Sequence, residues 1–268
     1  MKYLFTNGKI INGTREMQVQ EGQVILVEDG KITGILPYEE DKISELKASG
    51  YEEINLQGKY ILPGLINMHV HLAGNGKPLK KQRDTEALVK KIMSNGLTKA
   101  IAYRMVCGFA KDELYSGVTT IRTVGGLGDF DTRLRDDIAA GKKPGPRILA
   151  ANEGISVPGG HMAGSVAIAA GSIDEALQHL ETAKVQKVDL VKLMITGGVM
   201  DATEEGEPGA LRMPPELVKA ACDQAHELGL PVAAHVESAE GVRVALENGV
   251  DTIEHGAEPT PEILELFK

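Results

Sequence analysis

Apolar, strand-like segments alternate with helix-forming stretches along the chain from residue 61 onward. We predict helices near 129–140, 172–186, 215–228 and 239–248, and over 83–116 with a break near Asn95 and Gly96. The strand-like segments are ILPGLINMHV (61–70), GVTTIRTVGG (117–126), PRILAANEGI (146–155), VDLVKLMITGG (188–198), LPVAAHV (230–236) and VDTIEHG (250–256). Apolar strands separated by helices predict parallel pairing with both sheet faces buried, in an open doubly wound sheet or in a closed barrel.

Polar side chains gather at the carboxyl ends of these segments. They are His69, His71, Arg122, Asn152, Glu153, Lys192, His235 and His255. The active site of a TIM barrel is assembled from the carboxyl ends of several strands. This distribution therefore favours the barrel, and we predict an α/β fold of the TIM (β/α)8 type.

Residues 2–57 have a different pattern, in which short apolar segments are separated by turn residues. Asn7-Gly8 and Asp29-Gly30 are typical β-hairpin turns. Pro63-Gly64 marks the boundary with the alternating region. We predict a small N-terminal β-sandwich module over 1–60 and a barrel domain over 61–268.

The composition argues against several classes of protein. The 268 residues carry a net charge of −9 and no long basic cluster, which is a poor match to nucleic-acid binding. The N-terminus lacks the apolar core of a signal peptide, and no apolar run approaches membrane-spanning length. Cys107 and Cys222 fall in helical stretches and give no disulfide framework. We expect a cytoplasmic protein without a nucleic-acid or membrane partner.

His69 and His71 are separated by one valine at the end of the first barrel strand. Residues i and i+2 of an extended chain project to the same face, so the two imidazoles could share one ligand. A His-x-His pair by itself is more often a polar loop edge or a hydrogen-bonded pair. The rest of the chain has to decide between these interpretations.

Lys192 lies between Val191 and Leu193 in an otherwise apolar strand. A buried ammonium group costs several kcal/mol unless it is paired or neutralised. The lysine could snorkel from the strand end or form a salt bridge across the barrel. The alternative is an amine that is deprotonated and chemically converted.

His235 and His255 each end a strand of small or β-branched residues. Imidazole is the commonest metal ligand, although a single strand-end histidine is more often only hydrogen-bonded. Four histidines and one lysine at strand ends on one barrel face are much harder to explain as bystanders. The combination predicts a shared metal site.

These segments occur in a familiar order and spacing. LPGLINMHVHL, the lysine in VDLVKLMITGG, and the histidines in AAHVESAEG and GVDTIEHG resemble the amidohydrolase superfamily. Within it the chain looks most like the imidazolonepropionase-like group, which includes Xaa-Pro and Xaa-Arg dipeptidases. The likeness extends over nearly the whole chain, including the N-terminal module.

The resemblance implies a role for each residue. His69 and His71 match the pair that holds one divalent metal ion, and His235 and His255 match ligands of a second ion. Lys192 matches the lysine that reacts with carbon dioxide to form a carbamate bridging the two ions. We expect zinc, whose ligands in proteins include nitrogen and oxygen donors. Two such ions would supply hydroxide near neutral pH.

Two Gly-rich loops are softer candidates for substrate binding. His161 lies in VPGGHMAG, after the third strand, where the resembled group carries a Gly-Gly-His segment near the substrate. The loop TGGVMDATEEGEPG (196–209) resembles one that shapes the substrate pocket, although its acidic residues are also typical of a solvated rim. His179 and His226 fall within helices and are interpreted as surface positions.

The sequence departs from the family pattern at its end. Family members carry a metal-binding, proton-shuttling aspartate at the eighth strand, and no aspartate here matches it, so we assign no catalytic acid or base in this chain. A TIM barrel alone needs about 250 residues, so a barrel with this N-terminal module should exceed about 300. We expect the last two βα units, and the strands that complete the N-terminal module, to be missing.

We conclude from the sequence that the chain is a metal-dependent amidohydrolase that cleaves a C–N bond of a dipeptide or a cyclic amide. We expect a homo-oligomer or association with a complementary C-terminal segment. The first alternative is a catalytically incompetent fragment that assembles with such a segment. The second is an open α/β binding protein with an isolated histidine site.

Overall fold

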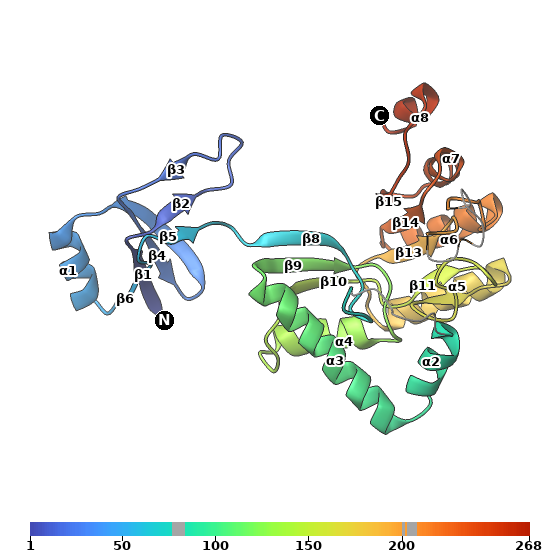
Figure 1. The fold of residues 1–268 in the computed structure, drawn as a ribbon, viewed down its shortest axis with the longest axis horizontal. Coiled ribbons are helices and arrows are strands. Elements are labelled where there is room, and N and C mark those ends of the chain that lie inside the picture. Colours follow the sequence, from blue (N-terminus) through green and yellow to red (C-terminus); the bar gives the residue numbers. More distant parts are fainter. Residues whose placement is uncertain (77–83, 200–201, 203–207) are drawn as a thin grey trace. The chain divides into compact units, whose positions relative to one another are not determined.

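The computed structural model describes residues 1–76, 84–199, 202 and 208–268 (Figure 1). The chain divides into two compact units, Met1–Gly64 and Leu65–Lys268.

The first unit is built of two small sheets and one helix. Its elements are β1 (Lys2–Thr6), β2 (Lys9–Ile11), β3 (Val19–Gln20), β4 (Gln23–Glu28), β5 (Lys31–Pro37), α1 (Glu40–Ala48), β6 (Glu52–Asn55) and β7 (Tyr60–Ile61). The sheet orders are β5-β4-β1-β6 and β3-β2-β7. Leu4, Val24, Leu26 and Ile43 form the buried cluster, which fixes α1 against the larger sheet because burial of apolar surface is favourable.

One of the two predicted hairpin turns of this unit is confirmed: Asp29 and Gly30 form the β4–β5 turn, both with positive φ. Two other details differ from the sequence-based expectation. Asn7-Gly8 forms no hairpin, because β1 pairs with β4 and β6 whereas β2 belongs to the other sheet. Helix α1 was not predicted, since its sequence, EDKISELKA, has too few apolar residues to show a helical period.

The second unit begins with six of its elements in the predicted βα order. They are β8 (Leu65–Val70), α2 (Thr85–Ile92), α3 (Gly96–Tyr115), β9 (Val118–Thr123), α4 (Phe130–Ala139) and β10 (Arg147–Ala150). The remaining elements are β11 (Gly154–Ser156), β12 (Ala167–Ala169), α5 (Ile173–Val185), β13 (Val191–Met194), α6 (Pro215–Glu227), β14 (Val232–Val236), α7 (Ala239–Glu247), β15 (Thr252–His255) and α8 (Pro261–Leu266). The predicted break before α3 is confirmed, because the Asn95 side chain caps that helix.

The strands of this unit form two parallel sheets, in the orders β10-β9-β8 and β12-β11-β13-β14-β15. The predicted continuous strand over 146–155 is divided at Asn152, a buried residue with a φ of 57°. Its amide bonds to Thr132 and Gln186, which stabilises the bend. As a result β10 pairs with β9 while β11 pairs with β13.

The wall of parallel strands with helices between them is of the TIM-barrel type. Among the described residues no ladder joins β15 to β8, so the barrel is not closed by backbone pairing within that part of the chain. Ile66 and Met68, on one face of β8, are exposed, although large apolar side chains such as these are usually buried.

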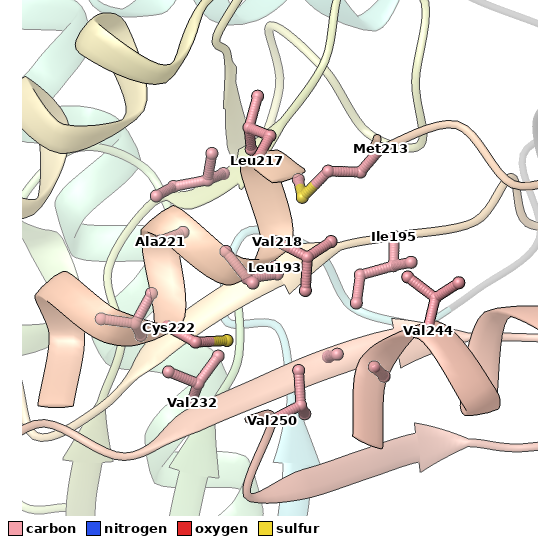
Figure 2. Close-up of a cluster of buried hydrophobic side chains, with 14 of the residues drawn as sticks. Leu193, Ile195, Met213, Leu217, Val218, Ala221, Cys222, Val232, Val244 and Val250 are labelled. Atoms are coloured by element: carbon pink, nitrogen blue, oxygen red, sulfur yellow. The ribbon is translucent and has the colours of Figure 1, made fainter. Parts of the chain in front are cut away.

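The core of the second unit lies between the strands and their helices. Figure 2 shows the larger cluster, in which Leu193 and Val232 of β13 and β14 pack against Val218 and Cys222 of α6. A second cluster joins β8 and β9 to α3 and α4. Because residues of these strands alternate between faces, the next residue on each strand points away from the helices.

No helix in the part of the chain that the structure describes is long and apolar enough to span a membrane.

Candidate metal centre

Strand alternation brings a set of polar residues to the face opposite the helices. His235 of β14 lies between Ala234 and Val236, which are both in the helix-facing core, and Lys192 of β13 lies between two further core residues. His235 is in register with Met194 and with Glu254 of β15. His69 and Arg122 occupy β8 and β9 and contact Glu254 across the interior.

His69 and His71 face each other through their Nε2 atoms, which are 3.2 Å apart. Nδ1 of His71 is 3.0 Å from the carbonyl oxygen of Gly125, and Nδ1 of His69 is 2.6 Å from Glu254 Oε2. A carbonyl and an ionised carboxylate only accept hydrogen bonds, so both Nδ1 atoms carry the proton. In neutral rings the two Nε2 lone pairs then point at each other, an arrangement that a cation between them would stabilise.

The spacing of these two nitrogens also fits a shared ion. Zinc binds histidine nitrogen at about 2.0–2.1 Å. Two ligands at that distance, with an angle near the tetrahedral value, lie roughly 3.2–3.4 Å apart. The His69 and His71 nitrogens have this separation.

His255 reaches the same cluster by a backbone irregularity. Glu254 faces the interior, so simple alternation would turn the next residue outward. His255 instead adopts a φ of 68°, which is uncommon for a residue other than glycine. Its ring lies 4.8 Å from those of His69 and His235, measured between centroids. Backbone strain of this kind is concentrated at functional sites.

A second group of donors surrounds His235. His235, His255 and Glu237 each offer one atom, and the three atoms lie within 4.8 Å of one another. Glu237 Oε1 is 3.6 Å from His235 Nε2, and His161 stacks on the His235 ring with 4.0 Å between centroids. The set of two imidazoles and one carboxylate is typical of divalent metal sites.

Lys192 is 1% exposed, and its Nζ has no hydrogen-bond partner among the described residues. Burial is the main cause that lowers the pKa of Lys192 to about 7; Glu254 opposes the shift and Arg122 adds to it. Lys192 also acts electrostatically on His71, His235 and His255, which places its amine among them. The amine is therefore available in its neutral, nucleophilic form near pH 7.

Three of these histidines, His71, His235 and His255, are kept neutral by the same environment. Burial lowers the pKa of His71 to about 4 and that of His235 to about 3. The pKa of His255 is also lowered, first by burial and then by His69 and Lys192. Neutral imidazole is the form that binds a metal ion.

Three residues of the site, Glu237, Glu254 and Arg122, had no assigned role from the sequence. Glu254 was missed, although Thr252 and Glu254 alternate with the apolar Ile253 and so share the interior face. Arg122 was recognised only as a polar strand end. The structure joins Arg122, Glu254 and His69 in one hydrogen-bonded chain.

The other predicted positions are also located. His161 lies beside His235, and both rings border Gly198, where an added Cβ would lie 2.6 Å from the His161 ring. Residues 200–201 and 203–207 of the predicted pocket loop lie outside the described residues. His226 is exposed and paired with Asp251, but His179 is half-buried against the Glu153 carbonyl, so its interpretation as a surface position was wrong.

Residues 60–260, which include every residue of this cluster, match the model of the amidohydrolase family. The chain belongs to the amidohydrolase family.

Solved structures extend the likeness of this amidohydrolase. A Xaa-Pro dipeptidase with bound methionine is 28% identical, with a TM-score of 0.75, and the alignment covers 99% of this chain and 64% of that one. A candidate prolidase from Bifidobacterium longum is 32% identical, with a TM-score of 0.74, over 99% of this chain and 57% of that one. The amidohydrolase chain thus spans about three fifths of these solved relatives.

A curated relative gives a shorter match. The dihydroorotase of Bacillus thuringiensis (strain Al Hakam) is 37% identical over 93 residues, which are 33% of this chain and 18% of that protein. The match is therefore confined to a short part of that dihydroorotase.

Proposed function

We propose that this amidohydrolase cleaves the C–N bond of a small amide, most simply a dipeptide, with water activated by two divalent metal ions. One observation carries the proposal: the Nε2 atoms of His69 and His71 face each other at 3.2 Å, and the Lys192 amine, which acts electrostatically on His71, has no hydrogen-bond partner among the described residues. Without a cation and an anionic group, the buried Lys192 amine has no hydrogen-bond partner in the part of the chain that the structure describes, and the two Nε2 atoms have only each other. The donor types fit zinc.

The proposed ligands divide into two sets. His69 and His71 hold one ion, and His235 and His255 hold the other, with Glu237 close enough to the second pair to contribute an oxygen. Divalent ions bound there would lower the pKa of a water molecule and polarise the substrate carbonyl. His71 and His235, held neutral by burial, would keep their lone pairs for metal over a wide pH range.

Lys192 is proposed to carry the bridging anion. Its neutral amine would attack carbon dioxide, forming an N–C bond and releasing one proton, so the product is a carbamate with one negative charge. The reaction removes a buried amine that has no partner and creates an oxygen donor for metal ions. Both oxygens of Glu254 pair with His69 and Arg122, and among the described residues no carboxylate pairs with Lys192.

His161 is proposed to bind the substrate. It lies on the Gly-rich loop after β11 and stacks on His235, so a carbonyl oxygen or carboxylate held at the ions would be within its reach. The dipeptidase likeness favours a dipeptide, and the dihydroorotase likeness makes a cyclic amide the second substrate class to test.

The unpaired strands favour one alternative. Both β8 and β15 have only one ladder neighbour among the described residues, and Ile66 and Met68 of β8 are exposed. Unpaired edges promote association with further strands. We propose that a complementary segment, in this polypeptide's full form or in a partner, pairs with these edges in the active protein, and that these 268 residues alone hydrolyse little substrate.

A hydrolysis screen tests both statements. The protein, loaded with zinc in bicarbonate buffer, is assayed against dipeptides, N-acyl amino acids and cyclic amides, with and without the complementary segment of a longer relative. Activity only in the complemented sample is the expected result. Absence of metal binding and of turnover in both samples would refute the hydrolase, and full activity of the 28.6 kDa chain alone would refute the need for a partner segment.

A further inference from the structure

Glu254 is a buried carboxylate with both oxygens occupied by side chains from other strands. Oε2 lies 2.6 Å from Nδ1 of His69, and Oε1 accepts a hydrogen bond from Nη2 of Arg122. We propose that Glu254, anchored by Arg122, is a positioning residue that fixes the ring orientation and tautomer of His69 for metal binding. This inference rests on the proposed function.

Arg122, which anchors this carboxylate, is held by several hydrogen bonds. Arg122 is itself largely buried, and its three nitrogens contact three different groups. Nε donates to the Met68 carbonyl at 2.8 Å, Nη1 donates to Thr252 Oγ1 at 3.2 Å, and Nη2 donates to Glu254. The guanidinium is a rigid planar fork, so these contacts hold the carboxylate in one place between β8 and β15.

The carboxylate in turn determines which nitrogen of His69 faces the metal site. An imidazole can rotate by half a turn about its Cβ–Cγ bond with little intrinsic preference, which exchanges Nδ1 with Cδ2 and Nε2 with Cε1 and would turn a C–H group toward the metal site. The ionised Glu254 accepts only from a protonated nitrogen, so it keeps the proton on Nδ1. Nε2 then remains unprotonated and directed at Nε2 of His71, 3.2 Å away.

The same contacts explain why Glu254 is not proposed as a ligand. Its oxygens are turned to His69 and Arg122, and its pKa is lowered because the hydrogen bond from His69, with Lys192 and Arg122, outweighs the effect of burial. A carboxylate behind a metal-binding histidine orients the ring and raises its basicity, and removing such a partner typically costs 10–100-fold in metal affinity.

The test compares Glu254→Ala and Glu254→Gln with Glu240→Gln. Glu240 also pairs with an arginine, but on the exposed face of α7 and away from the histidines, so it serves as the matched control. Zinc affinity is measured by competition with a chromophoric chelator. The tautomer of His69 is measured in the metal-free protein by long-range ¹H–¹⁵N correlation of ¹⁵N-histidine.

We expect Glu254→Ala to weaken zinc binding by about 10–100-fold and to convert His69 from the Nδ1-protonated form to a mixture of tautomers. Glu254→Gln keeps an acceptor oxygen and the side-chain volume, so its loss should be smaller, and it replaces the alanine variant if that variant does not fold. In a His69→Ala background, Glu254→Gln should have no further effect on zinc affinity.

The outcomes separate the inference from the function on which it rests. Suppose that the native protein binds zinc and that both Glu254 variants bind zinc as tightly as the native protein does. Glu254 then does not position His69. The same conclusion follows if the His69 tautomer in Glu254→Ala is that of the native protein. If the native protein binds no zinc, cobalt or manganese, the proposed function fails. The positioning role also fails if His69 of the native protein lacks the Nδ1-protonated form.

Discussion

The imidazole of His161 lies flat on that of His235, with 4.0 Å between ring centroids and 15° between ring planes. His161 lies in the loop between β11 and β12, whereas His235 lies in β14, and Gly198 lies against both rings. A residue proposed to bind substrate is thereby held directly over a residue proposed to bind metal. Substrate binding and metal binding should therefore respond differently to changes at these two positions.

The first prediction separates the two roles. His161→Phe keeps a flat ring that can stack on His235 but removes the hydrogen-bonding nitrogens. We expect KM to rise by about 10–100-fold, the range that corresponds to loss of a hydrogen bond to a charged group, while the zinc content is unchanged. Steady-state kinetics and elemental analysis of the same preparation, complemented with the segment of a longer relative, provide the measurement. Loss of one equivalent of zinc would instead show that His161 is a ligand.

The second prediction concerns the glycine beside these rings. A Cβ at position 198 would lie 2.6 Å from the His161 ring and 3.1 Å from the His235 ring, so Gly198→Ala should separate or displace them and lower kcat/KM by at least about ten-fold. Gly197→Ala is the control, because its Cβ would meet nothing nearer than 3.6 Å. Equal activity of both variants would show that the stacked arrangement is not needed.

The third prediction concerns Lys192. Lys192→Met replaces a buried, unpartnered amine by an apolar group of similar length, so the metal-free variant should be at least as stable as the native protein in urea unfolding. The same variant should lose metal binding and the carbamate signal that ¹³C NMR detects after addition of ¹³C-bicarbonate. A native protein that binds metal but gives no carbamate signal would contradict the proposal for this lysine.

The fourth prediction uses Asp131, which lies in the first turn of α4. Burial raises the pKa of Asp131 to about 6, its Oδ2 has no hydrogen-bond partner among the described residues, and the nearby Thr123 hydroxyl opposes the shift only in part. The unfolded value is 3.8, so the folded protein holds this proton more tightly between about pH 4 and pH 6. Ionisation above pH 6 therefore costs stability, and that cost disappears below pH 4.

Asp131→Asn removes the ionisable group while keeping its shape. We expect the unfolding free energy of the variant to exceed that of the native protein by up to about 3 kcal/mol at pH 8, and the difference to vanish near pH 4. Urea unfolding at several pH values measures this. A variant that is less stable than the native protein at pH 8 would mean that the ionised carboxylate is stabilised by groups that the described contacts do not include.

The order of strands and helices in the second unit could be predicted from the sequence because it depends on local periodicity. Each barrel strand is a short apolar run and each helix has a stripe of apolar residues, and both patterns are visible in a single window of residues. The proximity of the four histidines could be predicted for the same reason. His69, His71, His235 and His255 lie at or next to the carboxyl ends of their strands, and parallel strands bring such ends to one edge. Lys192 is the second residue of β13.

Other features depend on contacts between distant segments, and only the tertiary structure decided them. The bend at Asn152 depends on Thr132 and Gln186, and the inward turn of His255 depends on a single positive φ that no residue type dictates. The role of Glu254 depends on Arg122, 132 residues away in the chain. Sequence therefore determined which residues of a strand share one face, because alternation is local. The structure decided which nitrogen, oxygen or amine each presents there, because hydrogen bonds between strands fix the orientation of a ring or a carboxylate.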